Sequence, residues 1–246
     1  MKAILTYHSI DDSQSAISIT TDVFRRHVAW LASGAVRVVS IDELMTLPPQ
    51  ADAVALTFDD GFVSFAEIAA PLLARHHLPA TVFAVTEHVG GTNAWRGVCA
   101  QDIPTMPLMD WSELGRMSDM GFRIGAHSRT HPHLAEVSRA ALEDEIDGSA
   151  ARIERELGVR PTAFAYPYGS VNETVAAAAR GFRFGLSTEL RTIEAREDPC
   201  CLPRLDMYYF RAGTWLEAYG SGRFRQYLWV RSRARRIRAA LATAAE

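Results

Sequence analysis

Short apolar and β-branched runs alternate with helix-patterned segments along most of this 246-residue chain. The runs lie at 3–7, 36–40, 53–56, 80–85, 122–126, 162–166, 182–187 and 201–205. Because parallel strands need a crossover connection, which helices usually provide, this alternation predicts a parallel sheet covered by helices. The sheet is either open or closed into a barrel, and the count of seven or eight strands favours a barrel.

Polar residues gather where the predicted strands end. They are His8, Asp59, Asp60, His127, Tyr166, Tyr168, Arg204 and Asp206. In α/β barrels the carboxyl ends of the strands form one face, and active sites are built on it. Core packing does not explain why polar side chains gather there, so we expect a functional site on this face.

The apolar run 53–56 leads to two adjacent carboxylates, Asp59 and Asp60, and then to Gly61, which permits a sharp turn. Neighbouring carboxylates repel each other and add no stability by themselves. One interpretation is a polar turn in which Asp60 caps the following helix. The other is a site in which a cation holds one carboxylate while the second acts as a base.

His127 and His131 are four residues apart, which places both imidazoles on one side of a helical turn or tight loop. Two neutral histidines and a carboxylate form a three-ligand set with an open position, suited to catalytic zinc. The spacing alone is weak evidence, but the aspartate pair at an earlier strand end strengthens it. His133 is expected to be a loop histidine or one that supports the ligands.

Composition and targeting features exclude several classes of protein. The formal net charge of −3 and the pI of about 6.2 do not indicate nucleic-acid binding. Cys99, Cys200 and Cys201 match no zinc motif and are expected to be reduced thiols. The N-terminal residues lack the features of a signal peptide, and no stretch has the length of a transmembrane helix, so a cytoplasmic location is expected.

Three segments together resemble the polysaccharide deacetylase family, the NodB-homology group also called carbohydrate esterase family 4. The segments are Thr57-Phe58-Asp59-Asp60-Gly61, His127-Ser128-Arg129-Thr130-His131-Pro132 and Phe164-Ala165-Tyr166-Pro167-Tyr168-Gly169. Their order and spacing match the family, and the similarity extends from about residue 3 to about residue 210. The resemblance implies a deformed (β/α) barrel of about seven parallel strands and metal-dependent removal of N-acetyl groups from amino sugars.

The resemblance also implies roles by position. Asp60, His127 and His131 would bind the metal, with Zn²⁺ favoured over other divalent transition metals. Asp59 would be the general base, and the backbone N–H of Tyr168 would help to stabilise the oxyanion. Zinc suits this reaction because it polarises the acetamide carbonyl and lowers the pKa of its bound water.

The first departure from the family concerns the general acid. Many members supply it from a histidine near the C-terminus, but this chain has no histidine after His133. His8, in Tyr7-His8-Ser9, resembles the N-terminal motif of poly-N-acetylglucosamine de-N-acetylases, which have a permuted barrel and draw the acid from the start of the chain. We therefore expect His8 to be the acid, and the alternative is a capping or packing histidine.

The second departure concerns the partner of the base. Ala165 stands where many members have an arginine that pairs with the catalytic aspartate. Arg204 is expected to restore that partner, and Asp206 is expected to hold the His8 imidazole in its working tautomer. For each residue the alternative is a structural ion pair at a strand end.

The remaining candidates are expected to bind the sugar. They are Tyr166, Pro167, Tyr168, Gly169, Trp95 and Trp111. The two tyrosines would line the pocket, and the two tryptophans would form a stacking wall near the long loop 87–110. Because Trp111 begins a predicted helix, core packing is its alternative.

The last part of the chain lies beyond the similarity. Residues 223–241 carry seven arginines among apolar residues at helical spacing. We divide the chain into a barrel of residues 1–212 and a basic amphipathic helical extension of residues 213–246. Three uses of the extension compete: packing on the barrel, an oligomer contact, or peripheral contact with the anionic inner face of a membrane.

These observations predict a metal-dependent hydrolase that removes N-acetyl groups from N-acetylated amino-sugar polymers in bacterial exopolysaccharide or adhesin biosynthesis. A deacetylase of another glycan and a small-amide hydrolase on the same fold are the alternatives among enzymes. The alternative from another class is a non-catalytic carbohydrate-binding homologue, which the missing C-terminal histidine favours. Retention of all four residues Asp59, Asp60, His127 and His131 disfavours it.

Overall fold

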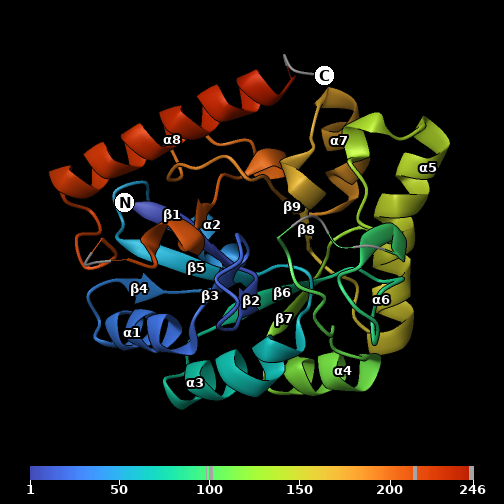
Figure 1. Ribbon diagram of the computed structural model, residues 1–246, viewed down its shortest axis with the longest axis horizontal. Helices are drawn as coiled ribbons and strands as arrows, with labels where there is room; N and C mark the ends of the chain where they lie inside the picture. Colours follow the sequence, from blue (N-terminus) through green and yellow to red (C-terminus); the bar gives the residue numbers. More distant parts are fainter. Residues whose placement is uncertain (98, 100–101, 213–214, 244–246) are drawn as a thin grey trace.

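The alternating segments form a curled parallel sheet with helices outside it (Figure 1). The computed structural model describes residues 1–97, 99, 102–212 and 215–243. The strand order is β10-β1-β5-β6-β7-β8-β9, and β4 pairs with β5. The strands are β1 (Lys2–Tyr7), β4 (Arg37–Val38), β5 (Ala53–Phe58), β6 (Ala80–Ala84), β7 (Arg123–Ala126), β8 (Ala163–Ala165), β9 (Phe184–Leu186) and β10 (Leu205–Asp206). Every one of these pairings is parallel, as the alternation predicts.

The longest pairing joins β1 to β5 over six residues, from Lys2 beside Ala53 to Tyr7 beside Phe58. Both strands are buried along their whole length, as expected for a parallel sheet that is covered on both faces. The buried Nζ of Lys2 donates to the carbonyl oxygens of Leu44 and Leu47, at 3.2 and 2.9 Å, so its polar head is satisfied.

A short segment near the end of the barrel joins the two edges of the sheet. Leu202 forms a parallel bridge with Leu186 of β9, and its N–H donates to the carbonyl of Gly185 at 2.7 Å. Three residues later, Leu205 of β10 pairs with Leu5 of β1. The sheet therefore curls until residues 202–206 connect its first and last strands.

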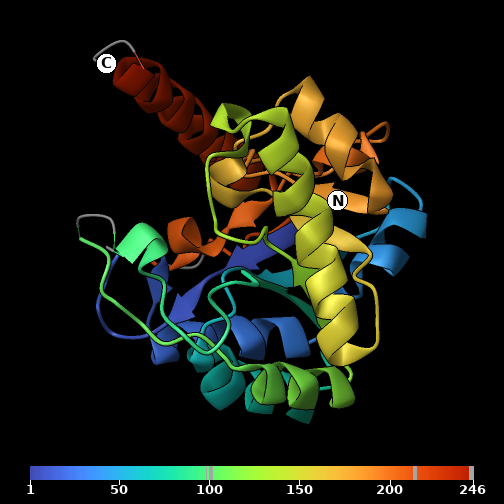
Figure 2. The same cartoon turned by 90° about the vertical axis from the view of Figure 1, so that its right-hand side faces the viewer.

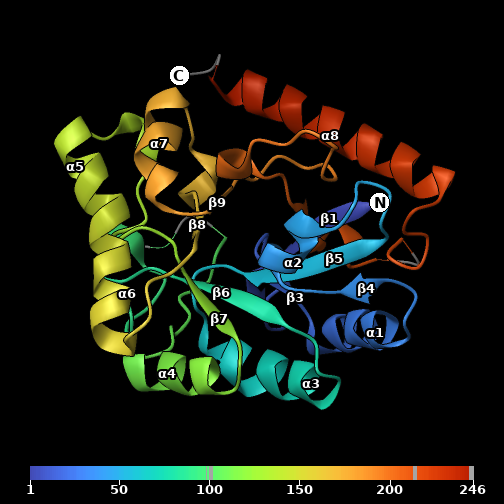
Figure 3. The same cartoon turned by 180° about the vertical axis from the view of Figure 1, so that it is seen from behind.

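Helices cover the outside of the curled sheet (Figures 1 and 3). They are α1 (Thr21–Ala32), α2 (Ile41–Thr46), α3 (Ala70–Arg75), α4 (Trp111–Asp119), α5 (Arg139–Glu143), α6 (Ser149–Leu157), α7 (Glu173–Ala178) and α8 (Gly222–Thr243). Two helices that the sequence predicts as continuous contain a π-helical turn, at Phe65–Ala69 before α3 and at Asp144–Gly148 between α5 and α6. In the described part of the chain, no helix has both the length and the apolar content to span a membrane.

Two predicted strands are shorter than the sequence indicates. The strand expected at 36–40 is limited to Arg37–Val38, at the start of β5. The strand expected at 201–205 is instead a 3₁₀ turn at Pro199–Cys201 followed by β10. Prolines at 199 and 203 have no N–H to donate to a sheet, which limits regular pairing in this segment.

A separate small sheet pairs β2 (Ser9–Ile10) with β3 (Ser18–Ile19).

Helix α8 packs on the barrel through its first turns and then projects from the body of the molecule (Figure 2). Phe224 and Leu228 are buried, whereas Ile237 is 61% exposed. The apolar residues predicted for one face of this helix therefore have different surroundings. Those in the first turns cover the core, whereas Ile237 further along the helix is exposed to solvent. Residues 213–214 and 244–246, and the side chains of Arg236, Arg238 and Leu241, lie outside the described part of the chain. The domain boundary at residue 212 stays a prediction.

Residues 200–202 pack against Gly185 and Leu186 of β9, and we call this contact the seam of the barrel. Gly185 tests the closure, because the seam leaves no room for a side chain at this position. A Cβ at this position would lie 2.3 Å from the carbonyl oxygen of Cys200 and 2.5 Å from the hydroxyl of Tyr166. We expect Gly185→Ala to lower the free energy of unfolding by about 1–3 kcal/mol or more, measured by urea denaturation. Gly222→Ala is the control, since no heavy atom lies within 4 Å of its Cβ. Equal stabilities of the two variants would contradict a tightly packed seam.

Candidate metal centre and catalytic pocket

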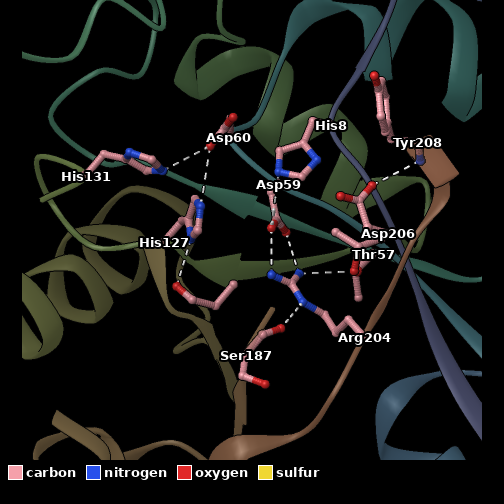
Figure 4. A network of polar contacts seen from close by, with 12 residues as sticks. His8, Thr57, Asp59, Asp60, His127, His131, Ser187, Arg204, Asp206 and Tyr208 are labelled. Carbon is pink, nitrogen blue, oxygen red and sulfur yellow. Dashed lines mark hydrogen bonds and ion pairs between the residues drawn. The ribbon is translucent and has the colours of Figure 1, made fainter. Parts of the chain in front are cut away.

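Asp60, His127 and His131 meet at the carboxyl end of the sheet, although they follow two different strands (Figure 4). Their ligand atoms all lie within 4.8 Å of one another, and all three residues are buried. Nε2 of each histidine lies 3.4 Å from Oδ1 of Asp60. A carboxylate and two imidazoles in this arrangement form a donor set for a divalent transition metal.

Two features of the structure test whether this triad fits a metal. Oδ1 of Asp60 is buried without a hydrogen-bond partner among the described residues, which is costly unless a ligand satisfies it. Nδ1 of His127 lies 2.7 Å from the carbonyl oxygen of Ala165. Because a carbonyl can only accept, Nδ1 donates, and the neutral imidazole presents the lone pair of Nε2 to the triad. The residues therefore fit a metal ion.

The electrostatics of the triad also favour a cation. Burial lowers the pKa of His131 to about 3, so this imidazole is neutral at neutral pH. Burial would also lower the pKa of His127, but the neighbouring carboxylates of Asp60 and Asp59 outweigh burial, and the pKa is raised. Burial would raise the pKa of Asp60, but the neighbouring imidazoles of His127, His131 and His8 outweigh burial, and the pKa is well below its usual value. The carboxylates thus stabilise positive charge where a metal would replace a proton.

Left-handed backbone conformations orient several side chains of this site. Of the seven non-glycine residues with positive φ in the described part of the chain, four lie here: Asp60, Ser128, His131 and Tyr168, at 70°, 62°, 60° and 57°. Such residues cost roughly 1–2 kcal/mol each, so surrounding contacts must hold them. One such contact is the hydrogen bond that the N–H of His131 donates to Oγ of Ser128 at 3.0 Å.

Asp59 is held by a buried ion pair with Arg204 (Figure 4). Nη1 and Nη2 of Arg204 each lie 2.7 Å from one oxygen of the Asp59 carboxylate. Nε of Arg204 donates to the carbonyl of Ser187 at 2.9 Å. Burial would raise the pKa of Asp59, but Arg204, His127 and His8 outweigh it and lower the pKa. Asp59 is therefore an ionised carboxylate that lies beside the metal triad.

His8 lies on the other side of Asp59. Its Nε2 is 3.8 Å from Oδ2 of Asp59, and its side chain is 24% exposed. The Asp206 carboxylate accepts the N–H of Tyr208 at 3.0 Å, and burial raises the pKa of Asp206. The structure therefore places His8 beside Asp59, while the roles of Asp59 as base, of His8 as acid and of Asp206 as the orienting partner of His8 stay predictions.

A cavity of about 320 Å³ opens above the triad. Trp95 stacks on His131, with ring centroids 4.5 Å apart and an interplanar angle of 25°. Tyr168 is half exposed and stacks on His133, with centroids 4.1 Å apart. Tyr166 also lines the cavity, but it is buried and its hydroxyl donates to the carbonyl of Cys200 at 2.7 Å. The cavity thus combines aromatic walls with a few polar groups, as small-molecule sites commonly do.

Some predicted sugar-binding residues are not on this cavity. Trp111 begins α4, lies under the guanidinium of Arg152 at 5.5 Å and is absent from the lining, which matches its core-packing alternative. Pro167 is buried in the turn after β8, and Gly169 lies against Thr188.

Several lining residues were not predicted from the sequence, namely Ile17, Asn93, Cys99, Ile103 and Thr188. Thr188 follows β9, so the rule about strand ends would have found it. The others lie in loops without periodicity, which carry no local indication of what they face.

Comparison with known proteins was made on sequence and on structure. A sequence model described as polysaccharide deacetylase matches residues 46–185, which is more than half of the chain. Poly-beta-1,6-N-acetyl-D-glucosamine N-deacetylase of Staphylococcus epidermidis is 23% identical over 204 residues, covering 76% of this chain and 67% of that protein. The chain spans about two thirds of the length of the curated relatives it matches, from 64% to 67%.

Solved structures show the same fold. The deacetylase PplD of Streptococcus pyogenes, in complex with acetate, has a TM-score of 0.69 at 22% identity, covering 83% of this chain and 91% of that chain. IcaB from Ammonifex degensii gives the same score, identity and coverage. The predicted deformed barrel is confirmed.

The buried ion pair leads to a stability prediction. We expect Arg204→Met to lower the free energy of unfolding by about 3–5 kcal/mol, because it leaves the Asp59 carboxylate buried without its partner. Arg25→Met is the control, since its ion pair with Asp22 is exposed, and it should change stability by less than about 1 kcal/mol. Urea denaturation measures both.

The stability difference between the wild type and Arg204→Met should change with pH in one direction. Because the folded state lowers the pKa of Asp59, its contribution to stability is present above the unfolded pKa of about 3.9 and is lost as the pH falls through the folded-state pKa. The difference between the wild type and Arg204→Met should therefore narrow on acidification. A difference that stays constant down to pH 2 would show that the pair is not its source.

Proposed function

This chain belongs to the polysaccharide deacetylase family, and we propose that it is a zinc-dependent hydrolase that removes N-acetyl groups from N-acetylated amino-sugar polymers, of the poly-N-acetylglucosamine type, in bacterial exopolysaccharide or adhesin biosynthesis. The observation that carries the proposal is the buried triad Asp60–His127–His131 beside an ionised Asp59. The similarity to the poly-beta-1,6-N-acetyl-D-glucosamine N-deacetylase of Staphylococcus epidermidis supports the polymer class.

The chain's own residues account for each proton in this reaction. A divalent metal held by the triad would polarise the acetamide carbonyl and lower the pKa of a water molecule. Asp59, kept ionised and oriented by Arg204, accepts a proton from the attacking water as the water oxygen bonds to the acetyl carbon. The backbone N–H of Tyr168 supports the oxyanion that forms.

The leaving nitrogen needs a proton, because an amide anion is a very poor leaving group. His8 lines the cavity and lies 3.8 Å from Asp59, so it can protonate this nitrogen as the carbon–nitrogen bond breaks. Acetate and a free amino sugar are the products. In this proposal His8 takes the place of the missing C-terminal histidine, the feature that favours a non-catalytic carbohydrate-binding protein.

Acetate release from β-1,6-linked N-acetylglucosamine oligomers tests the proposal. We expect the purified protein to release acetate, a chelator to abolish release, and added Zn²⁺ to restore it. Asp60→Asn should lose both zinc binding, measured by calorimetry, and turnover. Binding of the oligomers without release under any divalent metal would instead establish the carbohydrate-binding alternative.

The acid is tested in the same assay. His8→Ala should keep zinc affinity but lose about 10²–10⁴-fold in turnover, the usual contribution of a general acid. His76→Ala, an exposed histidine after α3, is the control. Near-normal turnover of His8→Ala would remove His8 from the mechanism.

We also propose that α8 binds the anionic inner surface of a membrane, which fits a cytoplasmic enzyme acting on a membrane-bound glycan. Trp229, Val230 and Ile237 are 58%, 51% and 61% exposed, and they lie on the helix face opposite the buried Phe224 and Leu228. The exposed Arg223 and Arg225 flank this face. An aromatic and aliphatic stripe bordered by arginines is typical of helices that lie in the membrane interface.

Vesicle sedimentation tests this membrane contact. The wild type should sediment with phosphatidylglycerol vesicles at low salt and not with phosphatidylcholine vesicles, and Trp229→Ser with Ile237→Ser should lose most of this binding. Val159→Ser, an equally exposed apolar residue after α6, is the control. Unchanged sedimentation of the double variant refutes the proposal, and loss of a concentration-dependent dimer in that variant would indicate a second copy of the chain as the partner.

A further inference from the structure

A second cavity of about 260 Å³ adjoins the metal cavity. His8, Ile17, Tyr168 and Thr188 line both cavities. We name the second cavity the side lobe; its further lining residues are Thr6, Ala16, Arg204, Asp206 and Arg235. A polymer with one sugar at the metal must place the next sugar in a neighbouring space, and the side lobe is such a space.

Arg235 brings α8 into this depression. It shares the inward face of α8 with the buried Phe224 and Leu228, and it lines both the side lobe and a third cavity of about 330 Å³. It also lies outside residues 46–185, which the family model matches. The common family pattern therefore does not account for this arginine.

Arg235 forms no direct ion pair or side-chain hydrogen bond with another described residue, although its charge acts on Asp206 in the same cavity. Glu189, which lines the third cavity, pairs with Arg191 at 2.9 Å. Asp206, the acidic residue of the side lobe, accepts the N–H of Tyr208, and the charge of Arg235 acts on this carboxyl without a direct ion pair between the two described side chains. Arg235 is thus a partly buried cation that faces the side lobe and has no direct ion pair among the described side chains.

We propose that Arg235 makes the side lobe a binding site for an anionic substituent, a carboxylate or a phosphate, on the sugar next to the one that is deacetylated. This inference rests on the proposed function and names a feature of its substrate. The guanidinium of arginine matches both anions through two parallel hydrogen bonds, and charged hydrogen bonds are about twice as strong as neutral ones. A neutral sugar would leave the charge of Arg235 uncompensated.

Three soluble probes test whether the side lobe prefers a neutral sugar, a carboxylate or a phosphate. The neutral probe is a β-1,6-linked N-acetylglucosamine tetramer. The carboxylate probe is a hyaluronan tetrasaccharide, in which N-acetylglucosamine alternates with glucuronate. The phosphate probe is a β-1,6-linked N-acetylglucosamine dimer that carries a phosphate on one of its two sugars. Affinity for each probe is measured by calorimetry, and kcat/KM by acetate release.

We expect the wild type to bind at least one charged probe about tenfold or more tightly than Arg235→Ala does, the usual effect of losing one charged hydrogen bond. The loss of kcat/KM should lie in KM, and Arg235→Lys should recover part of it. The neutral tetramer should be affected less than twofold. Arg139→Ala, whose side chain is exposed on α5, is the control and should affect no probe.

The outcomes also separate this inference from the proposed function. If the wild type deacetylates the neutral tetramer and Arg235→Ala behaves as wild type on both charged probes, the inference fails and the function stands. If Arg235→Ala weakens all three probes equally, Arg235 supports the barrel and the inference also fails. If no probe releases acetate, the function fails, and calorimetry with the charged probes still measures the site.

Discussion

The buried ion pair between Arg204 and Asp59 connects the closure of the barrel to the chemistry at its centre. One guanidinium binds both oxygens of Asp59 after β5 and the carbonyl of Ser187 after β9, and it lies in the segment that joins the edges of the sheet. A buried charge without its partner is strongly destabilising. The segment that closes the barrel therefore also supplies the counter-charge that keeps the buried Asp59 ionised.

The two adjacent aspartates have different surroundings, which supports the different roles that we propose for them. Asp60 is turned away by a left-handed backbone conformation and meets two histidines, whereas Asp59 meets an arginine. Two neighbouring carboxylates would repel each other in water. Here each carboxylate faces its own positive or metal-binding partner, so both remain ionised at a distance that allows one to hold a metal and the other to accept a proton.

Helix α8 gives two surfaces to a barrel that is otherwise typical of its family. Its inward face buries Phe224 and Leu228 and brings Arg235 to the side lobe. Its outward face exposes Trp229 and Ile237. The sequence indicates a basic amphipathic helix, but periodicity alone does not decide which apolar residues pack on the protein. That choice depends on where the helix meets the barrel, and it contacts the barrel mainly through its first turns.

The sequence by itself determined the alternation of strands and helices, the family, and the motifs that carry Asp60, His127 and His131, because periodicity and short spacings are local properties of a chain. It also indicated that His8 stands at a strand end and, through the resemblance to the family, that Arg204 pairs with Asp59, as the structure shows. Only the tertiary structure decided that Trp111 packs away from the cavity and that Arg235 reaches the side lobe. These contacts join residues distant in sequence, and they exist because a curled sheet brings its first and last strands together.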